Sequence, residues 1–219
     1  MGKSTLCDNL GQLLSGSQVV LEQFENNEFL PLYYEELEKN GPNAYNKYSL
    51  PSQLQFLKSR ISTEMTCSEP HKVYIIERSI AEDRFIFVEN MFRNGLLSHS
   101  ELEEFDLRRL ESTQNIDPVD IFIFLRADPQ TLKERITERG REMEQGISLE
   151  YLSSLNHLYE NKLLAELQKD ESNCKVLIYN VDTIGKDELA SVVQKDVEKV
   201  LEPRTAAAHC SVNAQRTTA

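Results

Sequence analysis

The first residues of the chain have the types and order that bind phosphate. Gly2, Lys3, Ser4 and Thr5 match the second half of the motif G-x-x-x-x-G-K-[ST], which opens a helix. In that motif the backbone N–H groups surround the phosphates, the lysine reaches the β and γ oxygens, and the hydroxyl holds Mg²⁺. We therefore predict a triphosphate site here. Because the first glycine and the strand that feeds it do not appear, we expect a fold that lacks its first strand.

A carboxylate follows the next apolar run of the chain. Glu22 comes directly after residues 18–21, which read as a strand. A carboxylate at a strand end can act as general base and accept the proton of an attacking hydroxyl. The alternative is an ordinary exposed glutamate, in a chain with 36 acidic residues.

Five charged residues fall within eight positions after a second apolar run, residues 73–76. Glu77 is a candidate Mg²⁺ ligand, directly or through water. Arg78 is a candidate partner that orients the base and neutralises developing charge. The alternative is a set of charges favoured at a helix start by the macrodipole, which explains Glu82 and Asp83 but not Arg78.

One segment of this acidic chain contains a cluster of basic residues. Lys133, Arg135, Arg139 and Arg141 lie close together, and Arg135 and Arg139 share one helical face because they are four residues apart. Gly140 should end the helix and leave Arg141 free to swing. Arginines on a segment above a phosphate site can form a lid that clamps the transferred group. The alternative is a solvated helix with i,i+4 ion pairs, since glutamates interleave with the arginines.

The elements that must position these residues alternate between two kinds. Short β-branched runs occur at 18–21, 73–76, 120–125 and 175–179, and between them apolar residues recur at helical spacing, as in 149–163. Continuous apolar strands separated by helices indicate a parallel sheet covered on both faces, with ligands at the carboxyl ends of the strands. The sequence therefore predicts a doubly wound α/β fold.

Composition limits the partners and the compartment. The net charge of −12 argues against nucleic-acid and anionic-membrane partners, which would be repelled. The four cysteines are widely separated, which favours reduced thiols, and no apolar run approaches a membrane span. We expect one domain over residues 1–202 and, because the composition after Pro203 is small and polar without periodicity, a disordered tail over 203–219.

Together these segments resemble the deoxyribonucleoside kinase family, from residue 2 to about 182. The most specific parts are residues 77–79 with 83–85, and residues 139–141 leading through 144–147 into 148–152. The resemblance implies a three-layer P-loop kinase fold with a central parallel sheet and an arginine-rich lid. It also implies transfer of a phosphoryl group from ATP or another nucleoside triphosphate, with Mg²⁺, to the 5′-hydroxyl of a deoxyribonucleoside. A homodimer in the cytoplasm is expected, with mitochondria as the alternative compartment.

The resemblance implies a role for each candidate residue. Glu22 would be the base, with Arg78 beside it, and Ser4 and Glu77 would hold the metal. The donor phosphates would be bound by Gly2, Lys3, Ser4 and Thr5. The lid would consist of Arg135, Arg139 and Arg141.

The resemblance also implies roles for residues that bind the acceptor nucleoside. Tyr34 and Glu144 would bind the deoxyribose 3′-hydroxyl, and Gln53 would pair with the nucleobase, supported by Arg60 and Asp83. On the residues alone, Gln53 is a polar residue on a helix and Tyr34 belongs to a plausible core stripe. The arginine–aspartate pair resembles members that act on cytosine or purines, and we favour purine.

Two other functions are compatible with parts of the sequence. A catalytically impaired kinase-like subunit or scaffold would explain the incomplete phosphate loop but not the joint presence of Glu22, Arg78 and the lid arginines. A nucleoside-monophosphate kinase would need a basic pocket for the acceptor phosphate, whereas residues 22–28 are acidic.

The assigned base contact leads to a first prediction. Asp83→Ala should lower activity on deoxyadenosine or deoxyguanosine more than on thymidine, because it removes an acceptor for the purine edge. Steady-state phosphorylation assays with each nucleoside test this. An equal loss on all substrates would contradict it.

Overall fold

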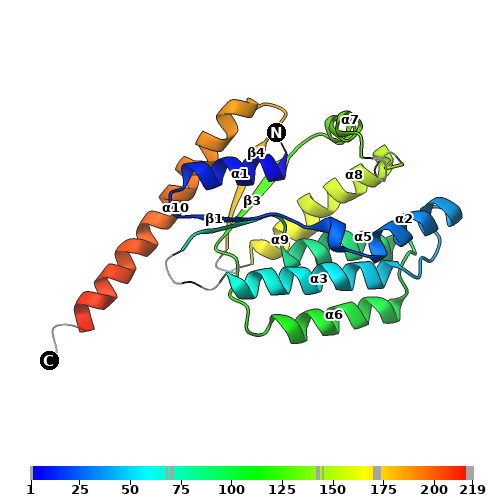
Figure 1. Cartoon of the computed structure of the whole chain (residues 1–219), viewed down its shortest axis with the longest axis horizontal. Helices are drawn as coiled ribbons and strands as arrows, with labels where there is room; N and C mark the ends of the chain where they lie inside the picture. The colour runs from blue at the N-terminus through cyan, green and yellow to red at the C-terminus, as the bar shows by residue number, and fades with distance from the viewer. Residues whose placement is uncertain are drawn as a thin grey trace.

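The computed structural model describes residues 2–67, 69, 72–141, 144, 146–169 and 174–215, and for residues 186 and 202–215 it describes the backbone alone. Helices and strands alternate along this chain (Figure 1). Their order is α1 (Lys3–Leu13), β1 (Gln18–Val20), η1 (Phe24–Asn26), α2 (Phe29–Asn40), α3 (Ser49–Thr66), β2 (Tyr74–Ile76), α4 (Ile80–Glu82), η2 (Asp83–Val88), α5 (Glu89–Arg93), α6 (His99–Thr113), β3 (Ile121–Arg126), α7 (Pro129–Arg139), α8 (Leu149–Leu158), η4 (Tyr159–Leu163), α9 (Leu164–Leu167), β4 (Lys175–Asn180) and α10 (Lys186–Gln215).

The strands are parallel, as predicted, and all four lie where the apolar runs placed them. They form two pairs: β1 pairs with β2, with Val19 opposite Ile75, and β3 pairs with β4, with Ile123 opposite Leu177. Within the described residues, no ladder joins the two pairs into one continuous sheet. The expected central sheet is therefore present as two parallel halves.

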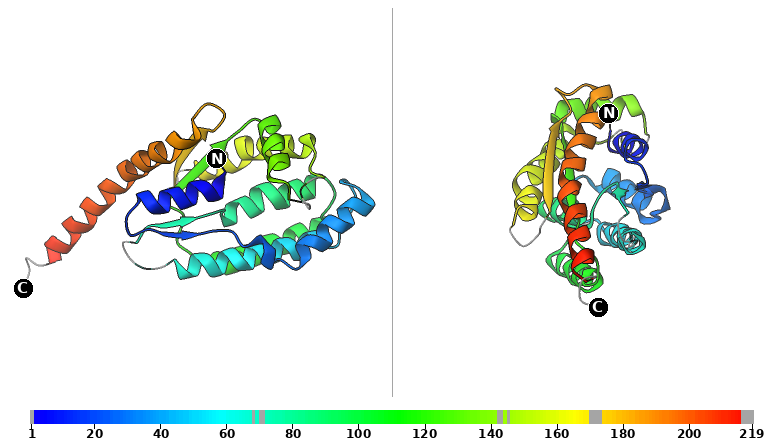
Figure 2. Two further views of the ribbon diagram at one scale, coloured as in Figure 1. Left: turned by 45° about the horizontal axis from the view of Figure 1, so that its top comes forward. Right: turned by 90° about the vertical axis from the view of Figure 1, so that its left-hand side faces the viewer.

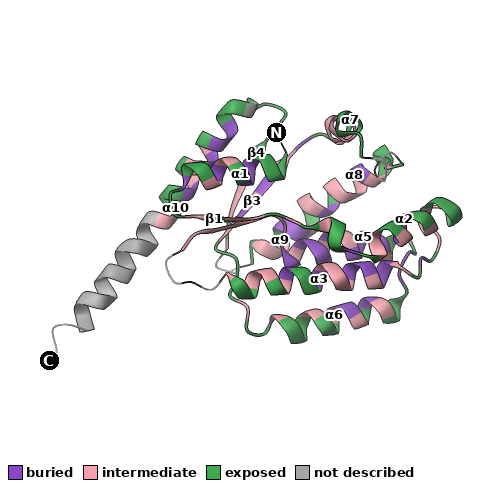
Figure 3. Cartoon of the chain, viewed as in Figure 1, coloured by how far each residue is buried: buried purple, intermediate pink, exposed green. Residues whose placement is uncertain are grey.

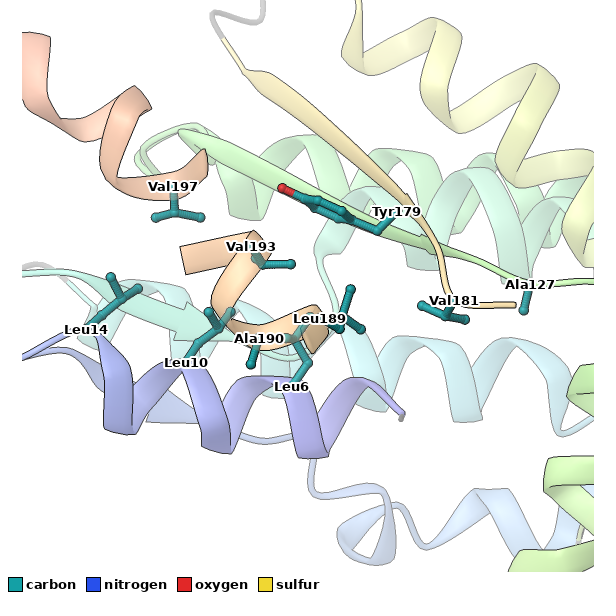
Figure 4. Close-up of a cluster of buried hydrophobic side chains, with 10 residues drawn as sticks. All are labelled: Leu6, Leu10, Leu14, Ala127, Tyr179, Val181, Leu189, Ala190, Val193 and Val197. Carbon is teal, nitrogen blue, oxygen red and sulfur yellow. The ribbon is translucent and has the colours of Figure 1, made fainter. Parts of the chain in front are cut away.

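Strand β3 separates two apolar layers, because successive side chains of a strand point to opposite faces. Ile121, Ile123 and Leu125 pack against a cluster formed by α1, α10 and the end of β4 (Figure 4). Phe122 and Phe124 pack on the other face, against η2, η4 and α9. The sequence expectation of a sheet covered on both faces is confirmed for this half, and α1 lies along the first turns of α10 (Figure 2).

A third apolar cluster joins α2, α3, α5 and α6, with Phe105 and Val88 fully buried. Figure 3 shows the buried residues where these helices face one another, whereas the outer side of α6 is exposed. There Leu107 and Leu110 are 58% and 56% exposed.

Two helical segments depart from the α-helical pattern. Residues of η2 and η4 form π-helical turns, and the two turns pack against each other. The apolar stripe of residues 149–163 predicts one regular helix, but the buried Leu158 and Leu163 lie five residues apart, as a π turn requires. The structure therefore replaces one predicted helix by α8, η4 and α9.

A cluster of ion pairs centred on Glu89 holds η2 and η4 together. The Glu89 carboxylate accepts hydrogen bonds from Arg84 at 3.0 Å and Arg93 at 2.8 Å, and it pairs with Lys162 of η4 at 2.5 Å. Burial raises the pKa of Glu89, but these three cations outweigh burial and lower it to about 2. Arg84 also binds Asp106 of α6 at 2.6 Å. The cluster thus ties η2, α5, α6 and η4 together.

The C-terminal helix packs its first turns on the core. Helix α10 runs from Lys186 to Gln215, and the expectation of a disordered tail over 203–219 stays a prediction. No helix among the described residues is both long enough and apolar enough to cross a membrane.

Close packing of α1 on β1 gives a second prediction. A Cβ added at Gly11 would lie 2.4 Å from Cγ2 of Val19, which is closer than any real contact. Gly11→Ala should lower the free energy of unfolding by about 1–3 kcal/mol through overpacking. Gly185→Ala is the matched control, because its Cβ would meet only the Glu188 side chain, at 4.0 Å. Urea unfolding of both variants tests this, and equal midpoints would contradict it.

Candidate active site

The predicted functional residues line one cleft of about 1580 Å³ at the carboxyl ends of β1, β2 and β3. Helices α1, α3 and α7 each place one group of side chains on its wall. The sequence-predicted residues that line it are Gly2, Lys3, Ser4, Thr5, Glu22, Tyr34, Gln53, Arg60, Glu77, Arg78, Asp83, Arg135, Arg139, Arg141 and Glu144. The structure therefore gathers the whole predicted set.

The start of α1 forms the phosphate end of the cleft. Gly2 caps the helix with an extended backbone, so the first N–H groups of α1 are available to an anion. Lys3 lies near Arg78, whose positive charge, together with desolvation in the cleft, lowers the pKa of Lys3 to about 8. Two cations that repel each other at a helix N-terminus favour binding of a polyanion.

A hydroxyl and a carboxylate meet beside this helix start. Ser4 Oγ donates a hydrogen bond to Glu77 Oε1 at 2.9 Å, and the backbone N–H of Glu22 donates to the other oxygen of Glu77 at 3.3 Å. Paired hydroxyl and carboxylate oxygens suit Mg²⁺, which takes few protein ligands and completes its shell with water and phosphate oxygens. The residues present fit the metal that the sequence predicts.

Glu22 lies between two guanidinium groups. Arg60 Nη2 donates to Glu22 Oε1 at 2.6 Å, and Arg78 Nε lies 3.5 Å from Oε2. Burial raises the pKa of Glu22, but the charges of Arg78 and Arg60 outweigh it and hold the pKa below its usual value. The carboxylate is therefore ionised at neutral pH and able to accept a proton.

Arg78 has an unusual backbone conformation, and its guanidinium contacts several side chains. Its φ of 74° is the one positive value among the described residues other than glycine, and such conformations are typical of functional sites. Its Nη1 donates to Glu82 at 3.1 Å and to the hydroxyl of Tyr159 at 2.9 Å. The guanidinium also lies over the ring of Phe87, 4.8 Å from its centroid.

The expected base-recognition residues lie deeper in the cleft. Arg60 Nε donates to both carboxylate oxygens of Asp83, at 2.8 and 2.7 Å. Burial raises the pKa of Asp83 to about 7, although Arg60 opposes the rise. Gln53 is 4% exposed, and its Oε1 has no hydrogen-bond partner among the described residues. A buried unpaired amide oxygen in a cleft is suited to a ligand donor.

The arginines of α7 bond outside their own helix. The helix begins at the Asp128 cap with Pro129 and ends at Gly140, whose φ of 69° is left-handed, as the sequence predicts. Arg135 donates to the carbonyl of Val181 at 3.2 Å, and Arg139 Nε donates to Glu144 at 3.1 Å. These contacts replace the ion pairs within α7 that the alternative reading expected.

Glu144 connects this segment to the acceptor side. Arg141 Nη1 lies 3.4 Å from Glu144, and its guanidinium stacks over the ring of Phe24 at 4.5 Å. Burial raises the pKa of Tyr34, and the negative charge of Glu144 raises it further, so the two side chains lie near each other. Tyr34 and Glu144, which the resemblance paired, are thus brought together.

The sequence did not assign two residues that the structure places against Arg78. Glu82 appeared only as a helix-start charge, but it forms a capping box with Ser79, a pattern visible as S-x-x-E. Tyr159 appeared only in an apolar stripe. No local signal identifies it, because its partners lie 77 and 81 residues away.

The chain is similar to known proteins of one family. A family model described as deoxynucleoside kinase matches residues 1–202. Deoxyguanosine kinase of Dictyostelium discoideum is 34% identical over 82% of this chain and 60% of its own length. Human deoxycytidine kinase is 31% identical over 89% and 85%, and deoxyadenosine/deoxycytidine kinase of Bacillus subtilis is 27% identical over 91% of each.

A solved structure, of deoxyadenosine kinase from M. mycoides with bound dCTP, matches with a TM-score of 0.71 and 22% identity, over 90% of this chain and 94% of that one. The chain spans less than two thirds of some relatives, 60% of the Dictyostelium kinase and 65% of human mitochondrial thymidine kinase 2. The solved structure establishes the three-layer kinase fold.

The buried Asp83 gives a third prediction. Its pKa rises from 3.8 to about 7 on folding, so the stability that this group contributes is fully present below pH 3.8 and is lost as the pH rises through 7. The free energy of unfolding of the wild type, relative to Asp83→Asn, should therefore fall between pH 5 and pH 8. Urea unfolding at both values tests this. A difference that does not change with pH would contradict it.

Proposed function

The chain belongs to the deoxynucleoside kinase family, and from this premise we propose that it transfers the γ-phosphoryl group of ATP to the 5′-hydroxyl of a deoxyribonucleoside. One observation carries the proposal: the ionised Glu22 lies between Arg60 and Arg78 in the same cleft as the α1 N-terminus and the Ser4–Glu77 pair. A base and a phosphate site that share one cleft support phosphoryl transfer to an alcohol.

Glu22 would accept the proton of the 5′-hydroxyl as its oxygen attacks the γ-phosphorus. A bond forms between that oxygen and phosphorus, the bond from phosphorus to the β–γ bridging oxygen breaks, and ADP leaves with the electron pair. A positioned general base contributes about 10²–10⁴ in rate. Arg78, adjacent to Glu22, would orient the carboxylate and offset charge that develops near it.

The donor triphosphate would lie at the start of α1. The backbone N–H groups and Lys3 would bind its oxygens, since at a pKa of about 8 Lys3 remains mostly protonated at neutral pH. Ser4 and Glu77 would hold Mg²⁺, which supplies charge neutralisation at the β and γ oxygens. Arg135, Arg139 and Arg141 would close over the transferred group and stabilise its charge.

The acceptor would occupy the deeper part of the cleft. Tyr34 and Glu144 would bind the 3′-hydroxyl, a contact that ribose and deoxyribose share. Gln53, whose buried Oε1 has no hydrogen-bond partner in the part of the chain that the structure describes, would pair with the base. The Arg60–Asp83 pair offers donors and an acceptor to a base edge, which supports a purine or cytosine over thymine.

A homodimer and a cytoplasmic or mitochondrial location complete the proposal. The exposed Leu107 and Leu110 support association through the outer helix α6.

Replacement of the base is the fourth prediction. Glu22→Gln keeps the size of the side chain and its hydrogen bond with Arg60 but cannot take a proton, so kcat should fall about 10²–10⁴-fold. Glu104→Gln is the matched control, because Glu104 lies on the outer helix α6, away from the cleft, and accepts a hydrogen bond from Arg108 of the same helix at 2.7 Å. Assays with ATP and each of the four deoxynucleosides measure the effect.

Two results would contradict the proposal. One is Glu22→Gln turning over at the wild-type rate. The other is a folded wild-type chain that transfers no phosphate to any of the four deoxynucleosides, which would favour a binding role.

A further inference from the structure

Tyr159 joins the cleft from the π-helical turn η4. Its side chain is part-buried, and its ring stacks on Phe124 of β3 with centroids 5.1 Å apart and planes inclined by 12°. Stacking of this kind fixes the ring plane and therefore the direction of the hydroxyl. π turns are rare and are frequently found at functional sites. The position of Tyr159 is thus set by the core rather than by solvent.

The hydroxyl of Tyr159 closes a triangle of hydrogen bonds. It donates to Glu82 Oε1 at 2.6 Å and accepts from Arg78 Nη1 at 2.9 Å, while Arg78 Nη1 also donates to Glu82 at 3.1 Å. A phenol can donate and accept at once without adding a charge. The hydroxyl therefore strengthens the contact between a buried carboxylate and a buried guanidinium without changing the net charge of the pair.

The triangle holds one side of Arg78, and Glu22 lies on the other. Arg78 Nε is 3.5 Å from Glu22, a longer contact than those to Glu82 and Tyr159. The stronger anchors therefore decide where the guanidinium lies relative to Glu22. The Arg78 backbone, at a φ of 74°, lies in a short link between β2 and α4 and is not held by a regular ladder.

We infer that Tyr159 is a positioning residue of the kinase site: with Glu82, its hydroxyl fixes the Arg78 guanidinium at the distance at which it orients the Glu22 carboxylate. The inference rests on the proposed function for its catalytic meaning. The contact geometry itself does not depend on that function.

The experiment compares wild type with Tyr159→Phe and with a matched control, Tyr179→Phe. Tyr179 is also buried, and its hydroxyl also donates to a carboxylate, Asp196 at 3.0 Å, but Tyr179 does not line the cleft. Both variants lose one phenol-to-carboxylate hydrogen bond. Similar losses of stability are expected, so unfolding alone does not distinguish them.

Two further measurements separate a positioning role from a structural one. In steady-state assays, Tyr159→Phe should lower kcat about 10-fold and leave KM for the deoxynucleoside within about twofold, because a displaced Arg78 weakens orientation of the base rather than substrate binding. Tyr179→Phe should change neither constant. The second measurement is a crystal structure of each variant, which gives the distance between Arg78 Nε and the Glu22 carboxylate.

This distance should increase in Tyr159→Phe and stay at 3.5 Å in Tyr179→Phe, because only the first variant removes a hydrogen-bond partner of Arg78. An unchanged distance in Tyr159→Phe would overturn the inference. An inactive wild type would refute the proposed function, and the distance would still decide the role of Tyr159.

Discussion

The cleft depends on pairing buried charges. Glu22, Glu82 and Asp83 are withdrawn from water, and two guanidinium groups, those of Arg60 and Arg78, bind all three. An unpaired buried ion costs several kcal/mol, and loss of one partner from a buried pair costs about 3–5 kcal/mol. Because each arginine binds two carboxylates, β1, α3 and the link after β2 have to be placed correctly at the same time. Near neutral pH, partial protonation of Asp83 relieves the remaining negative charge.

Local features of the surrounding fold hold these elements in place. The capping box of Ser79 and Glu82 starts α4 immediately after Arg78, so the left-handed arginine lies between a strand and a helix that are both fixed. A residue in such a conformation costs of order 1–3 kcal/mol, and it persists where its surroundings determine it. The π turns η2 and η4, fastened through Glu89, bring Asp83 and Tyr159 to the same wall.

The sequence predicted the parts of this arrangement that are local. Four apolar runs marked all four strands to within about a residue, and carboxylates and arginines just after them marked the cleft, because parallel strands carry their ligands at one edge. The pattern could not predict the π turn at Tyr159, since that turn depends on packing between distant segments. Arg60 illustrates the limit. Its position on a helix was evident, but its shared contact with Glu22 and Asp83 required the fold.

Helix α7 contains Arg135 and Arg139 but no fully buried residue. Its removal from the body would therefore uncover no fully buried side chain of its own, and the losses would be polar contacts that water can replace and the partly buried contact of Leu132 with the core. The segment between the Asp128 cap and Gly140 can thus open at a lower free energy than the rest of the chain. In hydrogen-exchange terms it is a unit of low local stability, so the site could admit and release large anions without a global opening of the protein.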